Sequence, residues 1–191
     1  ACQARLRAGL EAHPDDFFLL LELHLARRTT EDFEVVQSSL AALAAAHAGD
    51  ARYALLAAYL LSSDPDPSPA RAPLEALLRS HPEDAWVSLT AARAWSRGPG
   101  ADPARVQSHV LAFRRACPDS LESYHLTALF PDRKLAARLM VELRERLAKR
   151  DDREAQLAYP DLWQLELKLV PAERHAALRA QVARDAARQR A

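Results

Sequence analysis

Apolar side chains recur every three or four residues along most of the chain, which is the spacing that places them on one face of an α-helix. Proline and glycine stand between the periodic stretches, where they end one helix and start the next. The pattern predicts helices over residues 1–12, 14–25, 30–48, 50–61, 70–81, 83–95, 103–117, 121–130, 135–147 and 157–169, and a last one from 171 onward. The many alanines, with only 6% aromatic residues and 4 glycines, also favour helix over sheet.

The ends of these predicted helices repeat at a fixed interval. His13, His47 and His81 each stand at such an end and are 34 residues apart. A fourth copy, at Cys117-Pro118, arrives two residues late. A constant interval of this size is typical of architectures in which similar helical units stack side by side.

Several residues within the units resemble those of the tetratricopeptide repeat family, whose unit is a 34-residue pair of antiparallel helices. The matching positions are Ala57, Ala58, Ala91 and Ala92 within first helices, Ala70 in a second helix, Trp95 near a helix end, and Pro14, Pro82 and Pro118 at unit boundaries. The family's glycine in the first helix is replaced here by His24, Ala58, Ala92 and Ala128. The match extends from about Pro14 to Pro131, and the family pattern is degenerate within it.

This resemblance implies an all-α fold, an α-solenoid of antiparallel helix pairs. Residues 1–130 would form the repeats, the first helix being a partial repeat. Residues 131–191 would add further helices, a degenerate repeat and a C-terminal capping helix within the same continuous domain.

In the family, the first helix of each unit lines a concave groove. Transferring the groove-facing positions to this chain gives Phe18, Arg52, Tyr59, Trp86, Arg93, Arg97, Glu122 and His125. Tryptophan and arginine contribute much of the binding energy at protein interfaces. The alternative is that Trp86 and Tyr59 pack between repeats while the arginines are merely solvated. The family's clamp for chaperone C-termini is not expected, because its Lys and Asn positions fall on Leu21, Leu25, Leu56 and Trp86.

Charge and hydropathy exclude some classes of partner. The 26 basic residues balance the 26 acidic ones, so we expect no nucleic-acid partner. No apolar run approaches the ~18 residues of a membrane span, so we expect a soluble protein without membrane insertion. Cys2 and Cys117 would lie several units apart, too far for a disulfide, and unpaired thiols favour the cytoplasm.

We find no pattern that predicts catalysis or a bound cofactor. Phosphate-binding glycine loops, the GxSxG elbow, HExxH and CxxC are all missing from the sequence. The three repeat histidines stand one unit apart, too far to share a metal ion, and we interpret them as helix-end residues.

The predicted function is therefore a non-enzymatic interaction module that binds a peptide or helix of a partner protein. The alternative is a helical regulatory or substrate-positioning region of a longer enzyme, because the chain begins at Ala1 without methionine and inside a helical pattern. The Pro- and Ser-rich stretch from Ser62 to Pro69 predicts an exposed loop within one unit.

Overall fold

A computed structural model describes residues 2–13, 33–118, 120–147 and 162–189, with residues 19, 22, 23, 26, 27 and 149. In this part of the chain every regular element is a helix, which confirms the predicted all-α class. The α-helices are α1 (Cys2–Ala12), α3 (Phe33–Ala46), α4 (Ala51–Ser62), α5 (Arg71–Ser80), α6 (Ala85–Trp95), α7 (Pro103–Ala116), α8 (Tyr124–Thr127), α9 (Arg133–Leu147), residues 162–169, and α11 (His175–Gln189). Two short 3₁₀ helices, η1 (Ser68–Ala70) and η2 (Ala172–Arg174), precede α5 and α11.

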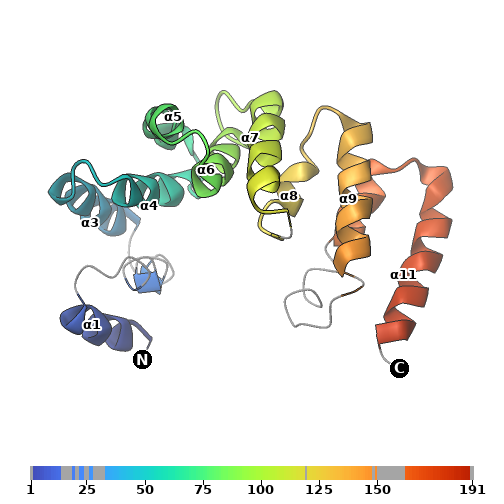
Figure 1. Cartoon of the computed structure of the whole chain (residues 1–191), viewed down its shortest axis with the longest axis horizontal. Coiled ribbons are helices and arrows are strands. Elements are labelled where there is room, and N and C mark those ends of the chain that lie inside the picture. The colour runs from blue at the N-terminus through green and yellow to red at the C-terminus, as the bar shows by residue number, and fades with distance from the viewer. Residues whose placement is uncertain are drawn as a thin grey trace.

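The helices follow one another in a row that bends, so that both chain ends lie on the same side of the molecule (Figure 1). Each of the helices from α3 to α9 packs against the next one along the chain, and α4 also packs against α6, past α5. Among the described helices there is none whose length and apolar character would carry it across a bilayer.

The same turn recurs before α4, α6 and α8. In each turn one residue makes two hydrogen bonds. Its backbone N–H donates to the carbonyl oxygen of the residue three positions earlier, and its side-chain oxygen accepts from the backbone N–H of the residue two positions later. The three turns join His47 to Asp50 (3.0 Å), His81 to Asp84 (3.2 Å) and Cys117 to Ser120 (3.2 Å). His81 and Cys117 share nearly the same backbone angles, φ −136° and ψ 62° against φ −129° and ψ 68°. The sequence repeat is therefore also a repeat of local structure, and the three histidines are helix-end residues.

Buried apolar side chains run continuously through the middle of the row. Leu74, Leu89, Val110 and Phe113 are fully buried between α5, α6 and α7, as their helical spacing predicts. A second cluster joins α9 to the helix at 162–169 through buried leucines and Met140, and Leu169 packs against both clusters.

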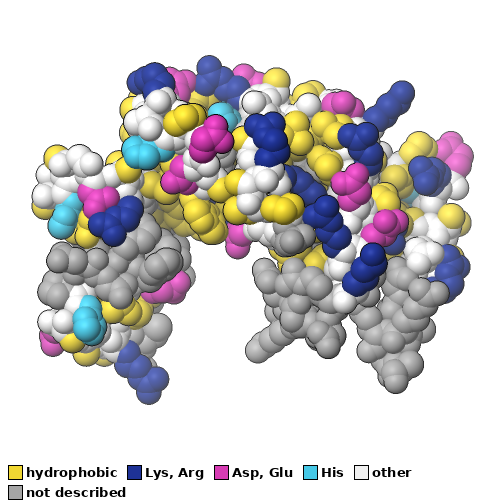
Figure 2. Space-filling view, in the orientation of Figure 1, with side chains coloured by type: hydrophobic (Ala, Val, Ile, Leu, Met, Phe, Trp, Pro, Cys, Tyr) yellow, Lys and Arg dark blue, Asp and Glu magenta, His cyan; other side chains and the backbone are white. Residues whose placement is uncertain are grey.

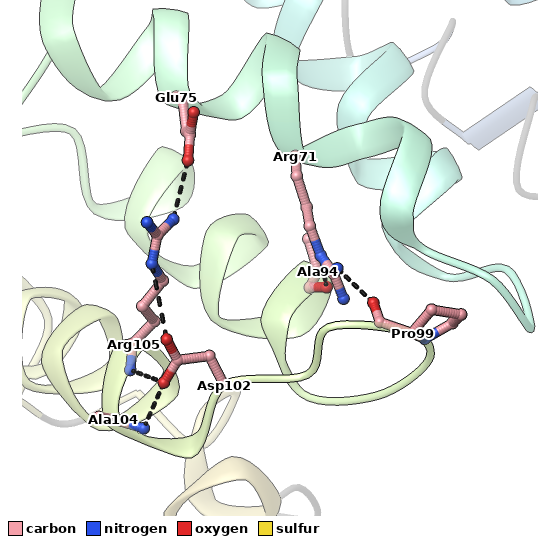
Figure 3. Close-up of polar contacts among 7 residues, drawn as sticks. All are labelled: Arg71, Glu75, Ala94, Pro99, Asp102, Ala104 and Arg105. Carbon is pink, nitrogen blue, oxygen red and sulfur yellow. Dashed lines mark hydrogen bonds and ion pairs between the residues drawn. The ribbon is translucent and has the colours of Figure 1, made fainter.

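Two arginines one repeat apart flank the buried indole of Trp95. The guanidinium carbon of Arg71 lies 5.9 Å from the ring centroid, and that of Arg105 lies 4.9 Å from it. Figure 3 shows Arg71 reaching from α5 to the backbone carbonyls of Ala94 and Pro99, and Arg105 lying between the carboxylates of Glu75 and Asp102. Arg71 therefore connects α5 to α6 and to the turn after it, and Arg105 connects α7 to α5.

The predicted helix over 121–130 is wrong in extent, because only Tyr124–Thr127 is α-helical. The N–H groups of Leu129 and Phe130 bond to carbonyls three residues back instead of four. Pro131 disfavours the α conformation of the residue before it, which explains the early end of the helix.

The stretch from Ser62 to Pro69 is only in part the exposed loop that its composition predicts. Pro65, Asp66 and Pro69 are exposed, but Ser62, Asp64 and Pro67 are buried. The loop packs against Gly98, whose φ is +74° and where an added Cβ would lie 2.9 Å from Pro67 Cδ. We therefore expect replacement by a Gly/Ser connector to destabilise the fold, contrary to the tolerance that the composition indicates.

Candidate functional site

Side chains from three helix-ending regions surround a hollow of about 520 Å³, which we call the α6 hollow. Its lining comes from the C-terminal ends of α4 and α6 and from α8 with the turn that follows it. The lining residues are Ser62, Ser63, Arg93, Ser96, Arg97, His125, Leu126 and Leu129. Figure 2 shows hydrophobic side chains gathered beneath α4 and α6, on the inner side of the bend.

Arg93 is held in place by neighbours on two other elements. Its guanidinium carbon lies 4.9 Å from the ring centroid of Tyr59 on α4. Its Nη2 donates to Glu122 Oε2 at 3.0 Å, just before α8. A guanidinium stacked on a ring and paired with a carboxylate loses little further freedom when a ligand binds. Arg93 is thus a preorganised cationic wall of the hollow.

Arg97 is four residues after Arg93, beyond the end of α6 at Trp95, and is exposed. Its Nη2 donates to the carbonyl oxygen of Ser62 at 3.3 Å, and this is the one hydrogen bond that the guanidinium makes to the residues that the structure describes. A guanidinium has five N–H donors in a planar fork, so most of those of Arg97 remain open to a ligand. This geometry suits bidentate pairing with a carboxylate.

The serine hydroxyls around the hollow are committed to their own helices. Ser62 and Ser63 both donate to the carbonyl oxygen of Tyr59, at 2.7 and 3.1 Å, and Ser96 donates to that of Arg93 at 2.7 Å. The remaining lone pairs of the Ser96 hydroxyl can accept N–H groups from a ligand backbone. Leu129, 43% exposed, adds an apolar surface to the same space.

His125 completes the wall opposite Arg93. Loss of hydration lowers the pKa of its imidazole, and the positive charge of Arg93 lowers it further, while Glu122 acts in the opposite direction. The ring is therefore neutral at pH 7 and gains a proton only in more acidic solution. A bound carboxylate would favour the protonated form.

The structure brings together five of the eight groove positions expected from the family resemblance. Tyr59, Arg93 and Glu122 are in direct contact, and Arg97 and His125 line the same hollow. Phe18 lies outside the described residues.

Two of the expected positions, Arg52 and Trp86, lie outside this group of five residues. Arg52 is exposed and pairs with Asp50, the cap of its own helix, at 2.6 Å. Hydrogen bonds from Arg52 hold the pKa of Asp50 at about 2. Arg52 is therefore already neutralised by a neighbour in sequence.

Trp86 lies two turns before Arg93 on the same face of α6. The edge of its indole meets Phe113 of α7 at a centroid distance of 6.1 Å, yet 52% of the residue is exposed. Trp86 thus combines one packed edge with an accessible surface outside the α6 hollow, which matches neither the fully packed nor the fully groove-lining interpretation.

The sequence did not identify the serines or the two leucines of the hollow. Serines at helix ends are common and carry no distinguishing signal. Arg71 and Arg105 were also missed, although their spacing of 34 residues repeats the interval between the histidines.

No family model matches the chain, and no match is found among curated proteins or solved structures. Within the described ranges, His, Cys, Asp and Glu side chains form no group of three or more that could hold a metal ion.

Proposed function

We propose that this protein is a non-enzymatic interaction module that binds a segment of a partner protein in the α6 hollow. The segment carries a carboxylate next to an apolar side chain. The carboxylate pairs with Arg97, supported by Arg93, and the apolar side chain packs on Leu126 and Leu129. The observation that carries the proposal is that the open donors of Arg97 and the exposed face of Leu129 line one space.

The proposed architecture is a tetratricopeptide-like α-solenoid of antiparallel helix pairs. Support comes from the capped turn that recurs before α4, α6 and α8, and from the packing of α4 against α6 past the intervening α5. A stacked-repeat protein exposes an extended inner face suited to another polypeptide. The C-terminal cap, formed by α11, belongs to the same proposal.

Selection from a phage-displayed library of random peptides about 12 residues long tests the function, since a peptide of that length spans a groove between helices. We expect enriched sequences to place Asp or Glu beside Leu, Ile or Phe. Selection with Arg97→Gln as the target should fail to enrich them, whereas selection with Arg115→Gln, which changes an exposed arginine at the end of α7, should still enrich them. Enrichment of peptides without any carboxylate, including the C-terminal one, would contradict the proposal.

The alternative of a regulatory region in a longer enzyme stays a prediction. No contact among the described residues favours it over the binding function.

A further inference from the structure

A second groove, separate from the α6 hollow, lies between α9 and the turn that leads into η2. It has a volume of about 480 Å³, and we call it the α9 groove. Its lining residues are Arg133, Lys134, Ala137, Arg138, Val141, Leu169, Val170, Pro171 and Arg174. Figure 2 shows Lys and Arg side chains over α9, with a few acidic side chains among them.

The lining of the α9 groove contains four cationic side chains and no carboxylate. Arg133 donates to the carbonyl oxygen of Ala128 at 2.9 Å, and Arg138 Nε forms an ion pair with Glu142 Oε1 at 3.9 Å. Lys134 and Arg174 have no ion-pair partner among the residues that the structure describes. In a chain whose acidic and basic residues are equal in number, this is a local excess of positive charge.

The position of two of these cations is unfavourable for the helix itself. Arg133 and Lys134 occupy the first turn of α9, where the helix dipole disfavours positive charge. Asp132 offsets this in part by accepting a hydrogen bond from the N–H of Leu135 at 2.9 Å. Asp132, which stabilises the N-terminus of α9, is thus followed at once by Arg133 and Lys134, which do not. This placement is expected where the cations bind a ligand.

The floor of the groove is apolar. Ala137 and Val141 are four residues apart on α9, so they lie on one face of the helix, and Leu169, Val170 and Pro171 form the opposite side. All except Pro171 are only partly buried, so apolar surface remains available to a ligand. An apolar strip between cationic rims is complementary to an apolar strip between anionic rims.

We propose that the α9 groove binds an acidic amphipathic helix of a partner protein. Such a helix places leucine-like side chains on the strip formed by Ala137, Val141 and Leu169, and its flanking carboxylates pair with Lys134 and Arg174. A nucleic acid fits less well, because no aromatic ring lines the groove to stack on a base.

Fluorescence anisotropy with a labelled model peptide tests this proposal. The probe is a Glu-, Ala- and Leu-containing peptide of about 18 residues whose leucines recur at i, i+4, i+7 and i+11. A control peptide has the same composition but leucines on all faces. We expect the probe to bind with a Kd of roughly 1–100 μM, more weakly at about 300 mM salt than at 50 mM, and the control peptide to bind much less.

The matched variants both remove two positive charges. Lys134→Gln with Arg174→Gln should weaken probe binding about tenfold. Arg79→Gln with Arg115→Gln, which neutralises two exposed arginines on α5 and α7, should change it less than about twofold. Ala137→Glu should abolish probe binding, because it places a carboxylate on the apolar floor of the α9 groove, where the acidic probe has to bind.

Three outcomes would overturn the proposal: equal loss in the two double variants, equal binding of both peptides, or tighter binding of a single-stranded oligonucleotide of the same charge. Arg97→Gln separates the two sites. It should leave probe binding at the α9 groove unchanged, so failure here and failure of the proposed function give different results.

Discussion

In the described part of the chain, three arginines lie over aromatic rings, and they differ in what else they contact. Arg71 and Arg105 flank the buried indole of Trp95 and also bond to backbone carbonyls or carboxylates. Arg93 lies over Tyr59 and pairs with Glu122. All three are held by contacts with other elements, whereas the guanidinium of Arg97 makes a single hydrogen bond to the residues that the structure describes. Arg71, Arg93 and Arg105 therefore connect elements of the fold, and Arg97 is the arginine that we propose pairs with a ligand.

Trp86→Ala separates packing from binding at a single residue. Because 52% of Trp86 is exposed and one edge of the ring meets Phe113, we expect the free energy of unfolding to fall by about 1.5 kcal/mol. That is less than the roughly 3–5 kcal/mol of a fully buried aromatic residue. Urea denaturation followed by circular dichroism measures it. A loss in the fully buried range would show that Trp86 is a packing residue rather than an accessible surface.

At the scale of elements, one ion pair fastens the helix at 162–169 to α9. Arg144 Nε donates to Glu166 Oε2 at 2.8 Å, and both side chains are buried. Removing one partner leaves the other charge buried and uncompensated, so Glu166→Ala should destabilise the fold by about 3 kcal/mol. The double variant Arg144→Met, Glu166→Leu should recover most of that loss, as judged by urea denaturation.

An exposed pair on the same helix serves as the control for that experiment. Arg138 and Glu142 lie 3.9 Å apart on the surface of α9, so Glu142→Ala should change stability by less than about 0.5 kcal/mol. If Glu166→Ala costs no more than this control, the buried pair does not fasten the two helices.

The packing of α7 against α6 also predicts a pH dependence of stability. Burial lowers the pKa of His109, whose ring lies 5.6 Å from that of Trp95, and the charge of Arg105 lowers it further. The unfolded chain, with an ordinary histidine pKa of about 6.5, therefore binds protons that the folded state does not. Stability is full above that value and is lost as the pH falls through it toward the lowered pKa of the folded state.

Urea denaturation at pH 7.5 and pH 5 measures this effect. His109→Gln should reduce the loss of stability between the two pH values, and adding His125→Gln, whose pKa is lowered by burial as well, should reduce it further. An unchanged loss in both variants would contradict the assignment.

For the whole molecule, the sequence predicted the all-α class and several helix ends, because these depend on local chemistry. Caps such as Asp84 and Asp102 accept hydrogen bonds from N–H groups two or three residues away, so their effect can be predicted from the sequence alone. The burial of the 62–69 loop was not predictable, because it depends on Gly98 meeting Pro67 across 31 residues of chain. The same holds for the α9 groove, which requires residues 169–174 to pack beside α9.

The candidate site was predictable in part for a similar reason. Arg93, Arg97 and His125 were named by transferring the groove-facing positions of the resembled family to this chain. Leu129 was not, since its place in the α6 hollow depends on α8 ending at Thr127. The serines were not either, because serines at helix ends are common and carry no distinguishing signal.

The central claim is that Arg97 pairs with a carboxylate of the bound segment, and a charge swap tests it most directly. The measurement is the affinity of a selected acidic peptide, and of the same peptide with its Asp or Glu replaced by Lys, for the wild-type protein and for Arg97→Glu. We predict that the wild type prefers the acidic peptide and that Arg97→Glu prefers the Lys peptide, each by at least about tenfold. If Arg97→Glu lowers the affinity for both peptides equally, or for neither, Arg97 does not pair with the carboxylate of the peptide and the proposed binding mode is wrong.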